Sequence, residues 1–88
     1  MMVQNEEDKI NSAVGALEEL KDDGTVPKNI KSKIETIISS LKDNKEVSIR
    51  INKALNELDE ISDNNNIQPY TRTQIWNIAS LLESIQSI

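Results

Sequence analysis

The chain of 88 residues contains no cysteine and no histidine. Without thiolates or imidazoles it can form no disulfide, no Cys₂His₂ or Cys₄ zinc site, and no Cys–His or Ser–His–Asp catalytic group. Its carboxylates lack the spacing of a calcium loop, and the Glu-x-x-His ligands of two-metal bundles need histidine. We therefore expect a protein that is not an enzyme and binds no cofactor, metal or small molecule.

Glycine and aromatic residues are also scarce, with two Gly, one Trp, one Tyr and no Phe. An aliphatic, glycine-poor composition favours helices over a β-sandwich or barrel, which would need more turn signals. No apolar run approaches the roughly 18 residues of a membrane span. The acidic start of the chain lacks the basic and apolar regions of a secretory signal. We expect one cytoplasmic domain spanning residues 1–88, with no membrane contact.

Apolar residues recur at three- and four-residue steps, which is typical of amphipathic helices. The pattern predicts four helices, at about residues 6–22, 27–42, 46–62 and 69–86. Asn5 is the expected N-cap of the first helix and Gly24 its left-handed stop, while Pro27 and Pro69 suit the first turns of the second and fourth. Because the connections are short, we predict an all-α, antiparallel up-and-down four-helix bundle.

The chain repeats itself with an offset of about forty residues, so that Leu17 falls on Leu58 and Ile34 on Ile75. One two-helix unit cannot bury its apolar stripe alone, so the bundle is predicted to form from two related hairpins that close on each other. The predicted core consists of Ile10, Leu17, Ile34, Ile37, Leu41, Ile51, Leu58, Ile75, Ile78 and Leu82.

Three segments resemble a known family: VPKNIK at 26–31, LDEIS at 58–62 and, most specifically, YTRTQIWN at 70–77. Over about residues 10–85 the chain is similar to a small archaeal family catalogued as uncharacterised protein family one-four-seven. The resemblance implies a helical bundle of archaeal, cytoplasmic origin, with no assigned activity, cofactor or substrate. The chain departs from the family in the asparagines at 64–66, where members use an Asp-Pro-Asn type of loop.

Trp76 lies well away from the apolar stripe of its helix, beside Arg72. A rigid aromatic next to an arginine is typical of an interface hot spot, and Tyr70, Ile49 and Leu81 also lie off the core faces. These residues predict a protein-interaction or scaffolding module that binds a protein partner or forms a homodimer. In the alternative interpretation, the indole covers the rim of the bundle and Arg72 lies across it.

Residues 28–53 carry seven basic and three acidic side chains, a net charge of +4 in a chain of net charge −5. Lys28, Lys31, Lys42 and Arg50 could form a strip for an acidic partner, so an accessory protein of an RNA-containing assembly is the alternative function. The strip could instead complement the acidic helices beside it. Because the whole chain is acidic, binding to nucleic acid is the less favoured interpretation.

Overall fold

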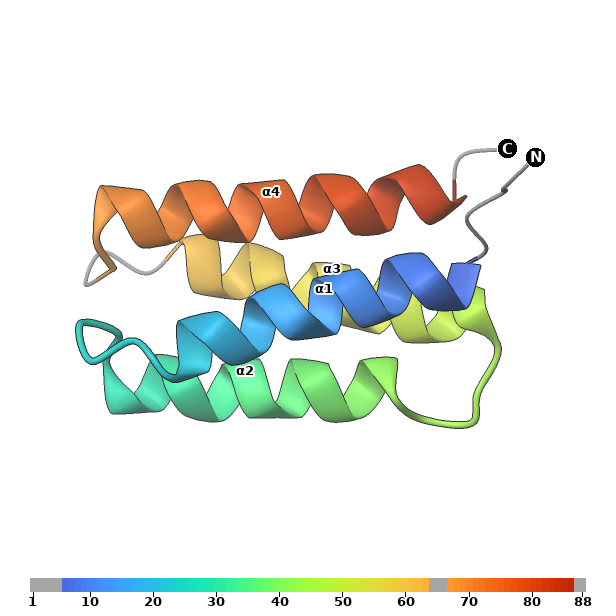
Figure 1. Ribbon diagram of the computed structural model, residues 1–88, viewed down its shortest axis with the longest axis horizontal. Helices are drawn as coiled ribbons and strands as arrows, with labels where there is room; N and C mark the ends of the chain where they lie inside the picture. The colour runs from blue at the N-terminus through green and yellow to red at the C-terminus, as the bar shows by residue number, and fades with distance from the viewer. Residues whose placement is uncertain (1–5, 64–66, 87–88) are drawn as a thin grey trace.

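The computed structural model describes residues 6–63 and 67–86, and in this part of the chain it contains four helices and no strand (Figure 1). They are α1 (Glu6–Lys21), α2 (Lys28–Leu41), α3 (Val47–Ser62) and α4 (Pro69–Gln86). The predicted all-α four-helix bundle is confirmed. The predicted N-cap Asn5 and the asparagines at 64–66 lie outside the described residues.

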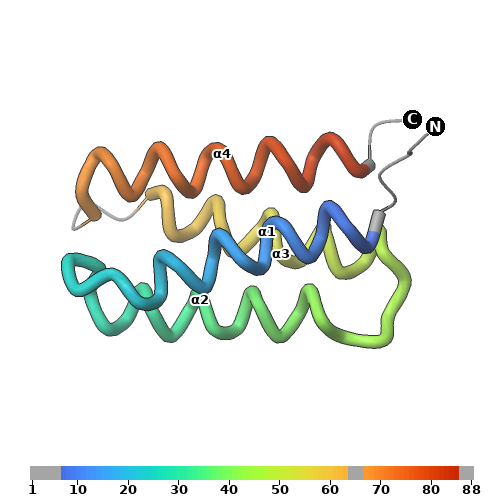
Figure 2. Tube along the Cα trace, in the orientation of Figure 1, coloured from blue at the N-terminus to red at the C-terminus, as the bar shows by residue number. Residues whose placement is uncertain are grey.

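Each helix packs mainly against two others: α1 and α3 each contact both α2 and α4. The tube in Figure 2 shows the connection from α1 to α2 at one end of the bundle, together with the end of α3 and the start of α4. The connection from α2 to α3 lies at the other end, with the start of α1 and the end of α4. Helices that follow one another in sequence are therefore antiparallel neighbours.

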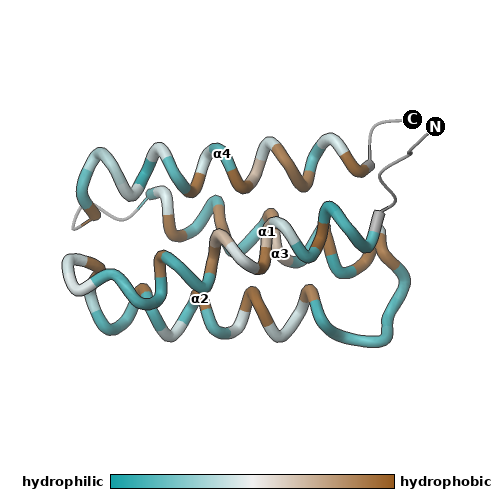
Figure 3. Tube along the Cα trace, in the orientation of Figure 1, coloured by the Kyte–Doolittle hydropathy of each residue, from teal (hydrophilic) through white to brown (hydrophobic). Residues whose placement is uncertain are grey.

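The ten residues of the predicted core are all buried. Apolar segments recur along all four helices, as Figure 3 shows in brown. The core also contains Val26 and Ile67, which precede α2 and α4 and are 4% and 6% exposed. Because these two residues lie where α2 and α4 begin, they close the same end of the core.

The sequence repeat is also a repeat of buried positions. The offset that places Ile34 on Ile75 also places Val26 on Ile67 and Ile30 on Thr71, and every one of these side chains is buried. Thr71 is therefore a polar residue at a core position of α4, with 1% of its surface exposed. At these three positions the two hairpins bury equivalent side chains, and differences between the hairpins occur elsewhere.

The turn after α1 differs from the prediction, because no glycine in the described part of the chain has a positive φ. Gly24 is therefore not a left-handed stop. Instead, the Asp23 carboxylate accepts hydrogen bonds from the backbone N–H and the hydroxyl of Thr25, at 2.9 and 2.7 Å. The N–H of Val26 donates to the Asp23 carbonyl at 3.1 Å. These side-chain and backbone bonds close the turn without a left-handed residue.

The two prolines stand at helix starts. Pro27 is the N-cap of α2 in an extended conformation, and its carbonyl accepts hydrogen bonds from the N–H groups of Ile30 and Lys31. Pro69 is the first residue of α4. At either place an N–H group would lack an intrahelical partner, so proline removes nothing that the helix needs.

Candidate protein interface between α3 and α4

An open groove of about 250 Å³ runs along the seam between α3 and α4. We call it the α3–α4 groove. Apolar side chains and acidic or amide side chains both contribute to its walls. The lining residues are Leu55, Asn56, Leu58, Asp59, Ser62, Ile75, Trp76, Ala79 and Glu83. An apolar floor with a polar rim can receive a protein side chain.

Trp76 lines this groove and is 57% exposed. Its ring is therefore mostly in solvent, and the interpretation in which the indole is largely covered does not hold. Arg72, one turn earlier on α4, is half-buried, and its Nε–H donates to the carbonyl of Ser62 at 3.2 Å. Arg72 thus ties the start of α4 to the last residue of α3.

The helix that carries Trp76 has few charges. Among the eighteen residues of α4 only Arg72 and Glu83 are charged, whereas seven of the sixteen residues of α1 are. The exposed positions of α4 are mainly Tyr, Thr, Asn and Ser. Protein interfaces are depleted in charged residues and enriched in tryptophan, tyrosine and arginine relative to other surfaces. The scarcity of charge on α4 and the exposure of Trp76 are features that protein interfaces share.

The first hairpin is an internal comparison for the groove, because the repeat places Glu18 on Asp59 and Lys42 on Glu83. In the first hairpin, the ammonium of Lys42 lies 3.9 Å from the carboxylate of Glu18, and this ion pair crosses the seam between α1 and α2. In the second hairpin both positions are acidic. Asp59 and Glu83 cannot pair, and in the described part of the chain no ion pair joins either of them to a cation.

The repeat also explains the space at the groove. Ala79 occupies the position of Ile38, which is buried against the core of the first hairpin at 8% exposure. An alanine leaves free the volume that the isoleucine fills. Three residues before Ala79, Trp76 occupies the position of Glu35. Relative to the first hairpin, the second therefore exchanges an ion pair and a large aliphatic side chain for two acids, a small side chain and an exposed indole.

The other residues of the predicted interface lie elsewhere. Tyr70 is 63% exposed in the first turn of α4, and its hydroxyl accepts a hydrogen bond from the side-chain amide of Gln74 at 2.7 Å. Ile49 is 50% exposed in the first turn of α3, at the opposite end of the bundle. Leu81 is half-buried and packs against the core. Of the five residues, the structure brings together Arg72 and Trp76.

The residues of the predicted basic strip have different surroundings. Lys28 is exposed and Lys42 pairs with Glu18 across the seam between α1 and α2. Lys31 is half-buried and near enough to Asp23 to help lower the pKa of that carboxyl. A further pair joins Lys33 to Glu60 at 3.6 Å. These contacts fit the interpretation in which basic residues complement acidic neighbours, and a use of the lysines toward a partner stays a prediction.

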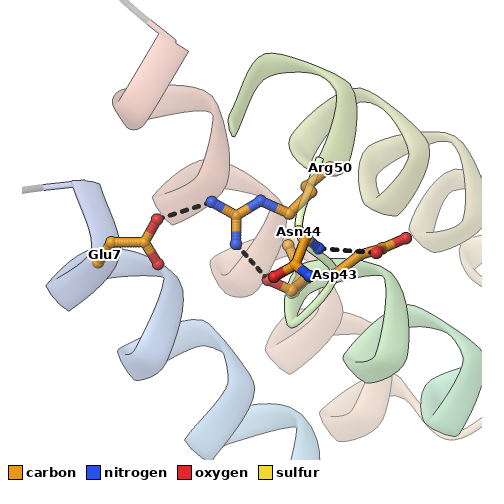
Figure 4. A network of polar contacts seen from close by, with 5 residues as sticks. Glu7, Asp43, Asn44 and Arg50 are labelled. Atoms are coloured by element: carbon orange, nitrogen blue, oxygen red, sulfur yellow. Dashed lines mark hydrogen bonds and ion pairs between the residues drawn. The ribbon is translucent and has the colours of Figure 1, made fainter. Parts of the chain in front are cut away.

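Arg50 is turned into the bundle, where it is 8% exposed. Its guanidinium donates to the carbonyl of Leu41 at 2.9 Å and to the carboxylate of Glu7 at 2.7 Å, as Figure 4 shows. The buried Nε has no hydrogen-bond partner in the described part of the chain. Arg50 therefore joins α1, α2 and α3 and does not extend to an outside partner as the strip would require.

Comparisons with known proteins show which family the chain belongs to. The sequence profile described as Uncharacterised protein family (UPF0147) matches residues 1–85. The chain belongs to the UPF0147 family. A UPF0147 protein of Sulfolobus acidocaldarius is 42% identical over 81 residues, which cover 91% of each chain. A UPF0147 protein of Pyrococcus furiosus is 35% identical over 88 residues, covering 98% of this chain and 95% of the relative.

A solved structure shares the fold. The crystal structure of the unknown function protein MMP1188 matches with a TM-score of 0.93 and 35% sequence identity, covering 99% of this chain and 100% of that one. The family is uncharacterised, and none of these names assigns an activity. The resemblance to uncharacterised protein family one-four-seven is confirmed, and the relatives are archaeal.

No helix among the described residues is long and apolar enough to cross a bilayer. Residues 6–63 and 67–86 also contain no group of three acidic side chains placed to hold a metal ion.

Proposed function

We propose that this UPF0147 protein is a non-enzymatic, cytoplasmic protein-interaction module that binds its partner through the α3–α4 groove. The observation that carries the proposal is the exposure of Trp76 on a groove with an apolar floor. A buried tryptophan at the centre of an interface is among the residues that contribute most to binding free energy. An exposed one on an almost uncharged helix has no comparable role in the stability of the monomer.

The surroundings of the groove support binding more than catalysis. Ser62 is the hydroxyl residue of its lining, and that hydroxyl donates to the backbone carbonyl of Asp59 at 2.9 Å. No lysine or histidine lines the groove, so the residues that most often activate a hydroxyl nucleophile are not beside Ser62. The two acids at the rim, Asp59 and Glu83, would instead attract a basic group of a partner.

The proposal is tested by comparing two exposed aromatic residues of the same helix. Tagged wild-type protein, Trp76→Ser and the control Tyr70→Ser are incubated with a lysate of the source organism, and self-association is followed separately by sedimentation equilibrium. The wild type should bind a partner, which is either another protein or a second copy. We expect Trp76→Ser to lose this binding and Tyr70→Ser to keep it. A wild-type chain that captures nothing and stays monomeric at several hundred micromolar would contradict the proposal.

A further inference from the structure

Four residues on the outer face of α4, which we call the α4 face, are spaced for a two-fold contact. They follow each other at steps of four, three and four residues, so they lie on one side of the helix within about one-sixth of a turn. The α4 face consists of Arg72, Trp76, Ala79 and Glu83. Three of them line the α3–α4 groove and Arg72 adjoins it through Ser62.

The α4 face is complementary to itself when two copies lie antiparallel. The midpoint between Arg72 and Glu83 coincides with the midpoint between Trp76 and Ala79, at the bond between Asn77 and Ile78. A two-fold axis through that point places each arginine opposite a glutamate and each tryptophan opposite an alanine. A parallel arrangement would instead place like charges and two indoles opposite each other.

We propose that the partner of the α3–α4 groove is a second copy of this chain, held in an isologous dimer by antiparallel α4 helices. This inference rests on the proposed function and names its partner. In the dimer, Trp76 of one copy lies over Ala79 of the other, in the space that Ile38 fills in the first hairpin. Because the two-fold axis repeats every contact, the dimer interface contains two contacts between Trp76 and Ala79 and two charge pairs between Arg72 and Glu83.

Charge supports this occupant. Asp59 and Glu83 leave the groove rim with two negative charges where the first hairpin has the pair of Glu18 and Lys42. Arg72 of the second copy would bring a cation to this rim. A guanidinium carries five N–H donors and can bond to several acceptors, so Arg72 can keep its bond to the carbonyl of Ser62 and also contact Glu83 of the other copy.

The first experiment follows the dimer directly. Because Trp76 is the only tryptophan of the chain, its emission reports on this face alone. We expect the emission to shift to shorter wavelength as the concentration rises through the micromolar range, together with dimer formation in sedimentation equilibrium. Trp76→Ser should raise the dimer Kd at least about tenfold, while Tyr70→Ser should leave it unchanged.

The second experiment tests the antiparallel register. Glu83→Lys places Arg72 opposite a lysine at both ends of the contact, and Arg72→Glu places two glutamates there, so each variant alone should dimerise at least about tenfold more weakly. Mixed in equal amounts, the two variants regain opposite charges at both ends. We expect this mixture to form a heterodimer with a Kd close to that of the wild-type dimer.

Controls separate folding from binding. Arg72 also holds the end of α3, so circular dichroism must first show that Arg72→Glu is folded. If it is not, Glu83→Lys and Trp76→Ser decide the matter without it, because both of these side chains are exposed and their replacement should not disturb the fold.

Each result has a definite meaning. A dimer that is insensitive to Trp76→Ser and Glu83→Lys overturns the inference, as does a mixture that stays as weak as its components when both fold. A monomer at several hundred micromolar that still captures another protein through Trp76 overturns the dimer but supports the proposed function. A monomer that captures nothing overturns both.

Discussion

The guanidinium of Arg50 donates a hydrogen bond to the carbonyl of Leu41, the last residue of α2, at 2.9 Å. Arg50 is the fourth residue of α3, and the carbonyl groups at the end of a helix lack intrahelical donors. A cation near the start of a helix opposes the helix dipole. The bond to the end of α2, where the dipole is negative, offsets that cost and fixes the connection between the two helices.

We expect Arg50→Ala to lower the free energy of unfolding by about 2–3 kcal/mol. Hydrogen bonds to charged groups contribute about 1.5–3 kcal/mol, and the substitution leaves the buried carbonyl of Leu41 without its donor. Urea unfolding followed by circular dichroism measures the change.

The control for Arg50→Ala is Glu7→Gln, which removes the charge of the other partner. The Glu7 side chain is 58% exposed, so its ion pair with Arg50 is screened by water and its loss should cost less than about 1 kcal/mol. If the two variants lose equal stability, the ion pair and not the bond to α2 is the important contact.

Arg72 repeats the relationship one helix later. It is the fourth residue of α4, and its Nε–H donates to the carbonyl of Ser62, the last residue of α3. Lys31 is likewise the fourth residue of α2, and it lies near Asp23 in the turn after α1. The fourth residue of α2, α3 and α4 is thus basic; Arg50 and Arg72 bond to the end of the preceding helix, and Lys31 lies near the turn after α1.

The sequence predicted the helices and the core well because both depend on the period of apolar residues. Aliphatic side chains at three- and four-residue steps can be buried together only on a helix, and the repeat gave the same stripe twice. It also placed Trp76 off the stripe, which the structure shows as exposure. Such properties need only the order of residues along one helix.

The burial of Arg50 and the backbone conformation at Gly24 could not be predicted from the period of apolar residues. On a helical wheel Arg50 lies only about 60° from the centre of the stripe of α3, which was the available signal, but its charge suggested an exposed residue. Its burial depends on acceptors from α1 and α2 that are distant in sequence. At Gly24, the bonds between Asp23 and Thr25 provided an alternative to a left-handed residue. The groove, too, depends on how α3 and α4 pack, because Ala79 leaves space at their seam that the period of apolar residues does not indicate.

We expect Leu58→Ala to lower the free energy of unfolding by about 2–5 kcal/mol, because it opens a cavity where the side chain is only 1% exposed. The matched control is Ile49→Ala on the same helix. Ile49 is 50% exposed, so its truncation should change stability by about 0.5 kcal/mol or less. Thermal melts that move equally for both variants would contradict the assignment of the core face of α3.

The turn after α1 should weaken in acid. The backbone and side-chain hydrogen bonds from Thr25 lower the pKa of Asp23 below its ordinary value, with a smaller contribution from Lys31. A lowered pKa contributes stability that is fully present above the pKa of the unfolded chain, about 3.9, and is lost as the pH falls through the lower folded pKa.

Asp23→Asn removes this titration, so the variant should be less stable than the wild type near neutral pH, and the difference should shrink below about pH 4. Urea unfolding between pH 3 and 7 measures the difference. Asp22→Asn is the control, because neither bond to Thr25 involves Asp22. A difference that is constant over this pH range would show that the Asp23 carboxylate is not the group responsible.

We expect no retention of RNA in a gel-shift experiment at about 150 mM salt. Arg50 is buried and Lys42 pairs with Glu18 of the bundle, so few cations of the basic strip are available to replace the counterions of phosphates. The accessory role in an RNA-containing assembly predicts the opposite result. A shift that weakens as salt rises, and that is lost with Lys28→Glu, would revive that function.

Glu83→Lys should slightly raise the free energy of unfolding of the monomer, because it rebuilds the charge arrangement of the first hairpin. A lysine at this position can pair with Asp59 as Lys42 pairs with Glu18. Since both side chains are exposed, the gain in the free energy of unfolding should be about 0.5 kcal/mol and should fall as salt rises.

The reverse change, Lys42→Glu, places two acids across the first seam and should lower stability by a similar amount. Both are measured by urea unfolding at a concentration where the chain is monomeric. If Glu83→Lys lowers the stability of the monomer, the repulsion between Asp59 and Glu83 does not keep the second seam open, and the smaller side chain of Ala79 remains as its cause.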